Sequence, residues 1–348
     1  KMNTSVTCTL VEIDHEWDNK IQSFDFDIYH MSGWIKSSAL IDQGEPKGLI
    51  ITLNEKTLLF PLIIRRLDDK YWDITSTYGY SGVLASTNLT ETEIDKMLTT
   101  AIDYLKDRHC VSWFLRLHPI LNANWFSHVG HLVAHGPTLS SDLTKTAEEH
   151  WAETQLRHQR GIKKAQKVGV TTKIEQLNNQ NLEIFIHIYE ETMRMLGATA
   201  FYFFHKQYYD SLLQLLHNNI ILITAFNKKQ KPIASSMYTY CQKSGIMQHH
   251  LGGTLDDYRE LQPSKLITHE ARQWGRENHY KVLHFGGGLG AQKDSLYEYK
   301  KGFSSNSHIF KTHRIVINQN VYHQLCHAKG CTEEQIHNLT EYFPLYRK

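Results

Sequence analysis

The chain has 348 residues, which is enough for two domains, and its 41% of hydrophobic residues excludes a disordered protein. Lysine and arginine (38) almost balance aspartate and glutamate (36), which gives a formal net charge of +2. This balance does not favour a protein that binds nucleic acid through its whole surface, so any contact with RNA needs a local basic patch.

The cysteines and the apolar runs indicate in which cellular compartment the protein is expected. The five cysteines are odd in number and mostly far apart, which is typical of reduced thiols rather than of a disulfide framework. No stretch approaches the ~20 apolar residues that span a bilayer. We therefore expect a cytoplasmic protein without a membrane span, either free or at the inner membrane surface. His323, Cys326, Cys331 and His337 do not have zinc-finger spacing, so no metal is expected.

The first half of the sequence predicts strands with one helix behind them. Two β-rich runs lie at hairpin distance. Thr90 and Glu93 predict a capping box, and Met97, Ala101 and Leu105 follow it at helical spacing. In chain order the expected elements are strands 48–54 and 57–64, a turn-rich loop 78–82, a helix from Thr90 and a strand 110–117.

The second half repeats this order after a connecting helix over 142–159 and a strongly basic helical segment over 156–169. A meander of strands, a helix and a further strand predict a mixed α/β sheet with helices on its faces. The expected elements are strand 170–176, helices 182–197 and 207–217, strands 220–227, 232–241 and 244–252, helix 263–278 and strand 281–285.

The region from 249 to 303 carries the sharpest chemical signal. Strand 246–251 ends in Gly252-Gly253, and the next helix begins at Pro263, where a missing N–H costs nothing. The N-terminus of a helix beside a strand end can bind a pyrophosphate. The stretch 259–265 contains no glycine that would let the backbone approach the phosphates closely.

Five segments in order carry a family resemblance. They are Asp73, Ser76 and Tyr78–Gly82; Arg160–Val170; Tyr189, Thr192, Met193 and Arg194 with the tyrosines after them; Gly286-Gly287; and Tyr299–Phe303. Together they resemble the Fem-like and BioF2-like acyltransferases of the GNAT superfamily, over residues 25 to about 310. Ser81, Tyr299 and Ser304 replace the proline, phenylalanine and glycine that are usual there.

The resemblance implies an α/β (α+β) fold of two tandem GNAT-like (acyl-CoA N-acyltransferase) domains. We expect them over 1–150 and 151–318, with the active cleft in the second and a helical tail over 319–348. The resemblance also implies an acyltransferase of cell-envelope biogenesis. The enzyme would move an activated acyl group to an amine of a small-molecule or nucleotide-linked glycan precursor in polysaccharide biosynthesis.

The donor implied is acyl-CoA, such as acetyl-CoA, or aminoacyl-tRNA. The stretch 259–265, which has no glycine, and the basic helix favour tRNA, whereas the GNAT order of elements favours CoA. Two other functions stay open. One is a Fem-type aminoacyltransferase that uses charged tRNA and acts on a peptidoglycan precursor. The other is a degenerate GNAT pair that binds a ligand without catalysis.

Lys300 stands at the lysine position of the last motif, and there it is expected to stabilise developing negative charge or to hold a phosphate. The alternative is a surface lysine paired with Glu298 or Asp294. An amine acceptor must lose a proton before it attacks. By residue type the candidates for this role are His249, His250, Asp294 and Asp73, of which we select His250 and Asp294.

Substrate-binding residues are expected in several places. The N–H groups at the end of strand 246–251 would face the donor carbonyl, and the glycine loop after strand 281–285 would let a substrate approach the backbone. Aromatic rings in loop 78–82 can stack on a sugar or uridine, or simply pack. The basic helix can contact phosphates, or be a solvated face. The residues selected are Gly286, Gly287, Gly288, Tyr78, Tyr80, Arg194, Arg160, Lys164, Lys36 and Tyr299.

Overall fold

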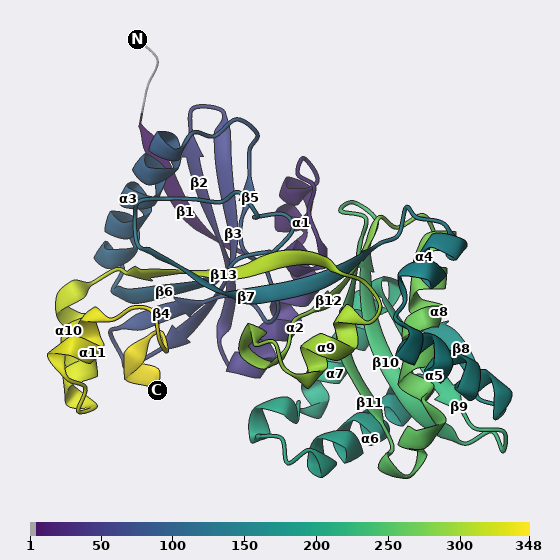
Figure 1. Cartoon of the computed structure of the whole chain (residues 1–348). Coiled ribbons are helices and arrows are strands. Elements are labelled where there is room, and N and C mark those ends of the chain that lie inside the picture. Colours follow the sequence, from purple (N-terminus) through teal and green to yellow (C-terminus); the bar gives the residue numbers. More distant parts are fainter. Residues whose placement is uncertain (1–4) are drawn as a thin grey trace. The chain divides into compact units, whose positions relative to one another are not determined.

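The computed structural model describes residues 5–348, which form two compact units (Figure 1). Unit 1 runs to His135 and resumes over Ile309–Lys348, and unit 2 is Gly136–His308. The chain enters unit 2 within strand β7 (His131–Asp142) and leaves it within strand β13 (Asn306–Val316). The units therefore differ in extent from the expected ranges 1–150, 151–318 and 319–348. Most of β7 belongs to unit 2, and the residues after His308 belong to unit 1.

Unit 1 is built on a sheet with the strand order β1–β2–β3–β4–β6–β13, with β5 beside β3. Three helices precede or follow the meander of this sheet. The strands are β1 (Val6–Glu12), β2 (Glu45–Leu53), β3 (Lys56–Arg66), β4 (Trp72–Thr75), β5 (Leu84–Ala85) and β6 (Cys110–Arg116), and the helices are α1 (His15–Ile21), α2 (Ser32–Asp42) and α3 (Glu91–Asp107).

Helix α3 forms as the sequence predicts. Thr90 and Glu93 make the reciprocal hydrogen bonds of a capping box. Met97, Ala101 and Leu105 are buried on one face and join the core of unit 1. The helical spacing of apolar residues therefore identifies the packed face correctly.

Unit 2 has the strand order β7–β12–β11–β10–β9–β8. Helices α5 and α8 pack against each other and share one core cluster with the sheet (Figure 1). The strands are β8 (Thr171–Gln176), β9 (Ile220–Phe226), β10 (Pro232–Cys241), β11 (Ile246–Thr254) and β12 (Val282–Gly286), and the helices are α4 (Ala147–Glu153), α5 (Leu156–Lys167), α6 (Asn179–Met195), α7 (Lys206–Leu216), α8 (Pro263–Glu277) and α9 (Ser295–Lys301).

The two units repeat one order of elements: a strand, two helices, a three-stranded meander, a helix and a strand. In unit 1 this is β1-α1-α2-β2-β3-β4-α3-β6, with the short strand β5 inserted between β4 and α3, and in unit 2 it is β8-α6-α7-β9-β10-β11-α8-β12. In each unit the last two strands of the repeat, β4 and β6 or β11 and β12, pair in parallel. A further antiparallel strand completes each sheet, β13 on β6 and β7 on β12. The expected mixed α/β architecture is confirmed.

The prediction of one helix over 142–159 is wrong. Asp142 ends strand β7, and two helices follow it, separated by extended backbone at Thr154 and Gln155. The hydroxyl of Thr154 accepts a hydrogen bond of 2.6 Å from Arg272 of α8, a contact between residues far apart in sequence. Tertiary contacts thus override the local helical signal.

Two helices lie in unit 1 within the segment 319–348, for which a helical tail was expected. Helices α10 (Gln319–Ala328) and α11 (Glu333–His337) pack with Tyr322, Phe343 and Tyr346 in one buried cluster. The carboxylate of Asp73 in β4 is fully buried and accepts hydrogen bonds from Arg65, from Tyr346 and from Arg347. Asp73 therefore anchors the last residues of the chain to the sheet, and this use leaves it out of the candidate proton acceptors.

No helix within residues 5–348 has the length and apolar character needed to cross a membrane.

Replacing Asp73 with asparagine should destabilise unit 1 strongly. The carboxylate pairs with two guanidinium groups, at 2.9 Å from Arg65 and 2.7 Å from Arg347, so its loss removes the acid that contacts both cations. We expect a loss of roughly 3 kcal/mol in the free energy of unfolding, measured with denaturant. Asp210→Asn, which removes an exposed pair with Lys206, is the control and should cost less than about 1 kcal/mol. Equal effects of the two changes would contradict the anchoring role.

Candidate active site

Strands β11 and β12 pair only over Ile246–Gln248 and Val282–His284 and then separate. Both strands have a bulge just past the last pair, at His250 in β11 and at Phe285 in β12. A bulge bends a strand and increases its twist. Past Gln248, β11 continues along β10 and has no ladder partner in β12 within the described residues. We call this separation the fork.

Lys300 of helix α9 lies at the fork. Its Nζ donates a hydrogen bond of 2.6 Å to the carbonyl of Gly287, in the loop after β12. Burial lowers the pKa of Lys300 to about 8, and the carboxylate of Asp294 opposes this effect. Burial and the nearby Lys300 charge together lower the pKa of His249 to about 3. The structure thus brings Lys300 together with His249 rather than with the selected His250.

His250 has a different neighbour. Its Nε2 lies 2.8 Å from the hydroxyl of Tyr208 in helix α7. Burial, followed by the effect of His249, lowers the pKa of His250 to about 3. The ring is therefore neutral at physiological pH and is a weak base.

Asp294 serves the local fold. Its carboxylate accepts hydrogen bonds of 2.9 Å from the N–H groups of Tyr297, at the start of α9, and of Leu289. Burial alone would raise its pKa, but these backbone donors outweigh burial and hold the pKa of Asp294 below its usual value. An ionised Asp294 therefore caps α9 and places a negative charge near Lys300.

Backbone conformation and close packing favour glycine at the positions after β12. Gly286 has a φ of 77°, which favours glycine. A Cβ on Gly288 would lie 2.1 Å from Oδ1 of Asp294, and one on Gly287 would lie 2.8 Å from the carbonyl oxygen of Pro137. The chain thus packs tightly around this loop, and its contact with a substrate stays a prediction.

The N-terminus of α8 carries a second cluster. Pro263 is at the first helical position, and no side chain caps the helix. The hydroxyl of Tyr299 donates to Ser264 at 3.3 Å, and Nζ of Lys265 lies 3.4 Å from the carbonyl of Arg157. Burial and the charge of Arg157 lower the pKa of Lys265. A helix N-terminus with two cations and two hydroxyls is suited to bind an anion.

Three further selected residues of unit 2 are exposed on helices α5 and α6. Arg160 and Lys164 are exposed on α5 beyond Arg157, and within residues 5–348 they make no ion pair. Arg194 is exposed on α6 and pairs with Glu191 at 2.6 Å. Its neighbour Thr192 faces β11 instead, where its hydroxyl donates to the carbonyl of Thr254 at 3.2 Å.

The other three selected residues belong to unit 1. Lys36 is exposed on α2. The ring of Tyr80 packs edge-on against Phe310 at 5.3 Å and lies beneath the guanidinium of Arg116. The carbonyl of Tyr78 accepts a hydrogen bond from the indole of Trp34. Loop 78–82 is therefore packed, and its binding of a sugar or uridine stays a prediction.

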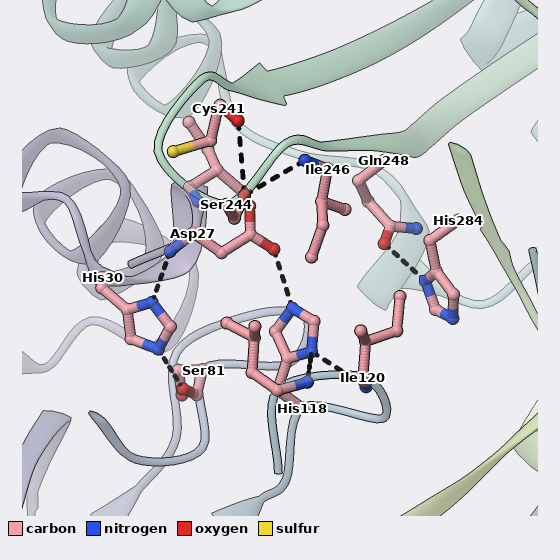
Figure 2. A network of polar contacts seen from close by, with 12 residues as sticks. Asp27, His30, Ser81, His118, Ile120, Cys241, Ser244, Ile246, Gln248 and His284 are labelled. Atoms are coloured by element: carbon pink, nitrogen blue, oxygen red, sulfur yellow. Dashed lines mark hydrogen bonds and ion pairs between the residues drawn. The ribbon is translucent and has the colours of Figure 1, made fainter. Parts of the chain in front are cut away.

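Unit 1 also holds a buried histidine network that the sequence does not reveal (Figure 2). Nε2 of His118 lies 2.7 Å from the carboxylate of Asp27, which resembles a catalytic dyad. However, Nδ1 of His118 accepts hydrogen bonds from the N–H groups of Ile120 and Leu121, so no ring nitrogen is left for a substrate. His30 likewise uses both nitrogens, on the N–H of Asp27 and the carbonyl of Ser81. The network holds loops together.

No cluster of three His, Cys, Asp or Glu side chains that suits a metal ion occurs in the part of the chain that the structure describes.

Comparisons with known proteins agree with this geometry. Residues 153–301 match the family model described as an acetyltransferase (GNAT) domain. The crystal structure of FemX is similar, with a TM-score of 0.66 and 12% identity over 91% of this chain and 99% of that chain. A protein of unknown function from Bacteroides thetaiotaomicron has a TM-score of 0.58 and 8% identity, over 89% of this chain and 100% of that chain. For L-PGS from Bacillus licheniformis the TM-score is 0.54 and the identity 11%, over 88% of this chain and 93% of that chain. No curated protein sequence matches the chain.

The matched segment contains the fork, the N-terminus of α8 and Lys300. The chain therefore contains a GNAT acetyltransferase domain, and the protein is an acyltransferase by class. The expected likeness to Fem-like GNAT proteins is confirmed, and the similar structures share the fold over most of the chain.

The neutral histidines of the fork should make the protein less stable in acid. Burial lowers the pKa values of His249 and His250 to about 3 in the folded protein, from the ordinary histidine value of 6.5. The contribution of these two neutral histidines to the free energy of unfolding is complete above pH 6.5. It is lost as the pH falls from 6.5 toward 3, because the unfolded chain takes up the protons first. Unfolding by denaturant at pH 7, 6 and 5 should show this decline. In His250→Gln the free energy of unfolding should decline less steeply as the pH falls. The same decline as in the wild type would contradict a neutral His250.

Proposed function

We propose that the protein transfers an activated acyl group from a phosphate-bearing donor to an amine of a cell-envelope glycan precursor. The observation that carries this proposal is the placement of Tyr299 and Lys300 on one helix. Tyr299 contacts the N-terminus of α8 and Lys300 lies at the fork. A donor with its phosphates at α8 would thus have its acyl carbonyl within reach of the fork.

The fork supplies the groups that an acyl carbonyl needs. Past Gln248, β11 has no ladder partner in β12 within the described residues, so the carbonyl oxygen of the donor would lie along this edge of the strand. The acceptor amine attacks the carbonyl carbon, and negative charge develops on this oxygen in the tetrahedral intermediate. The ammonium of Lys300 stabilises that charge until the bond between the acyl carbon and the donor breaks. The rest of the donor then keeps the electron pair of that bond and takes up the proton that the amine loses.

The amine must shed a proton, and the selected groups are poorly suited to take it. His250 is a weak base that contacts Tyr208, and the carboxylate of Asp294 is occupied by two backbone N–H groups. We therefore infer that the acceptor is bound as the neutral amine, or that its own substituents carry the proton away. His249 lies nearer the reacting atoms, but the charge of Lys300 keeps it neutral and weakly basic.

Replacing Lys300 with alanine should lower turnover at least ~10-fold. The pKa of Lys300 is about 8, so the ammonium, and with it the rate, should decline as the pH rises above about 8. Lys300→Arg keeps its charge over this range and should lack the decline. The measurement is the rate between pH 6.5 and 9.5 at saturating donor. Near-normal turnover of Lys300→Ala would remove the ammonium from the mechanism.

The cluster at α8 supports a donor with phosphates, and both acyl-CoA and aminoacyl-tRNA fit this description. Acetyl-CoA should bind with a Kd at or below ~100 μM, which corresponds to ~5.5 kcal/mol. Arg157→Ala and Lys265→Ala should each weaken this binding roughly fivefold or more. Lys206→Ala, on an exposed pair in α7, is the control and should leave it unchanged. Calorimetry at moderate salt measures the Kd of acetyl-CoA for the wild type and for the three variants.

Aminoacyl-tRNA is the second candidate donor, because α5 continues from Arg157 into an exposed row of cations that includes Arg160 and Lys164. A folded protein that binds no acetyl-CoA, and whose activity is lost with RNase and falls steeply with salt, would favour tRNA. That result would also favour a peptidoglycan precursor as the acceptor, as in the Fem-like family, over a precursor of surface polysaccharide. Either acceptor would be met in the cytoplasm or at the inner membrane surface.

A further inference from the structure

One end of the sheet of unit 2 exposes large apolar side chains. Helix α6 ends there, because the hydroxyl of Thr192 in its last turn donates to the carbonyl of Thr254, the last residue of β11, at 3.2 Å. The chain that follows exposes 60% of Met195, 63% of Leu196 and 54% of Phe201. We call these three residues the apolar segment. Exposed apolar groups that lie together are typical of a surface that binds a partner or a membrane.

The same end of the sheet carries a group of cations. Thr254 pairs with Ala234 near the start of β10, and the turn before β10 is the lysine-rich segment 227–231 (Figure 1). This turn lies beside the end of α5, because a Cβ on Gly169 would be 2.9 Å from Cβ of Lys228. The outer face of α5 and the turn therefore form one basic surface of exposed cations. They are Arg160, Lys163, Lys164, Lys167, Lys228, Lys229 and Lys231.

Few acids oppose the basic surface. None of its seven cations is in an ion pair within the residues that the structure describes. An acidic element, the 3-10 helix Asp256–Leu261, packs against α5. Asp256 pairs with Arg259 at 3.5 Å, so Asp257 and Glu260 are the unpaired acids of this helix. The cations outnumber these acids, and the surface therefore attracts anions.

This combination of side chains suits an anionic membrane better than RNA. Six of the seven cations are lysines, which are point charges and lack the planar fork that arginine offers to individual phosphates. RNA bases stack on aromatic rings, whereas Met195 and Leu196 expose flexible aliphatic side chains. A bilayer uses both kinds of group, because lysines attract anionic headgroups and apolar side chains enter the interface.

We propose that this end of unit 2 docks on a membrane surface that contains anionic lipids. The basic surface lies over the headgroups, and the apolar segment inserts among them. The inference goes beyond the proposed function, because docking needs neither an acyl donor nor an acceptor and is measured without them. A failure of docking would therefore leave the proposed acyl transfer untouched.

The test is sedimentation of the whole chain with vesicles of phosphatidylcholine, with or without about 30% of phosphatidylglycerol. We expect a partition coefficient at least about tenfold higher for the anionic vesicles, and a decrease of this value as salt is added. The double variant Lys228→Gln with Lys229→Gln should lose about tenfold or more, because each lysine near an anionic surface contributes roughly fivefold.

A second double variant tests the apolar segment. Met195→Ser with Leu196→Ser keeps every charge and removes two exposed apolar side chains. Its partition coefficient for anionic vesicles should fall about threefold or more at low and at high salt, because apolar insertion is not screened by ions. Circular dichroism checks the folding of each variant, and Phe201→Ser replaces the double serine variant if that protein does not fold.

Lys243→Gln with Lys281→Gln is the matched control. It removes the same charge from two exposed lysines at the opposite end of the same sheet, where Lys281 lies beside Gly245 in the turn between β10 and β11. This variant should keep the partition coefficient of the wild type. An equal loss in both lysine variants would overturn the proposal, because attraction by net charge alone predicts that result.

Two further results would overturn membrane docking. One is a folded wild type that does not sediment with anionic vesicles, and the other is unchanged binding in either the Lys228→Gln, Lys229→Gln variant or the serine variant. Bulk tRNA is tested in parallel with the same proteins. Binding of tRNA that depends on Lys228 and Lys229, without binding of anionic vesicles, would assign the basic surface to RNA instead.

Discussion

The candidate site depends on the early end of one parallel ladder. β11 and β12 share only three residue pairs before the bulges at His250 and Phe285 turn them apart. Backbone N–H and C=O groups inside a protein need partners, and two neighbouring strands normally supply them. Each strand keeps its outer neighbour, β10 or β7, so the sheet stays intact while its inner ladder stops. In the proposed reaction, the acyl carbonyl of the donor takes the place that a strand would have taken.

Burial decides where charge is found at the fork. The same low-dielectric surroundings that keep His249 and His250 neutral also bring the pKa of Lys300 down to about 8, but not below physiological pH. Asp294 helps to keep the ammonium charged, and its own hydrogen bonds to the backbone keep it ionised. The ammonium of Lys300 thus lies at the point where negative charge is expected to develop in the proposed reaction.

Elements with strong local signals were predictable from the sequence. A capping box marks the start of α3, and Pro263 marks the start of α8. Strands β7 and β13 were not predicted, because their partners β12 and β6 lie far away in the sequence. Helices α1 and α2 were missed as well, and the residues of the expected connecting helix belong to β7, α4 and α5.

The candidate site was predictable in part. The motif that contains Tyr299 and Lys300 lies on α9, where Tyr299 contacts Ser264 and Lys300 contacts the carbonyl of Gly287. The choice between His249 and His250 depends on a bulge, which changes the face on which a side chain lies and leaves no mark in the sequence. Lys265 and Arg157 meet only because α5 packs on α8.

The route of the chain through β7 and β13 has a consequence for folding during synthesis. Unit 2 is one continuous segment, whereas the sheet of unit 1 lacks β13 until the ribosome has passed all of unit 2. Asp73 meets Arg347 only after all of unit 2 has been made, because unit 2 lies between these two residues, which are 274 positions apart. Contacts of such long range are slow to form, so unit 1 should emerge as an incomplete, aggregation-prone intermediate whose edge strand β6 is exposed. The later-made unit would then finish folding before the earlier one, the reverse of the usual order for consecutive domains.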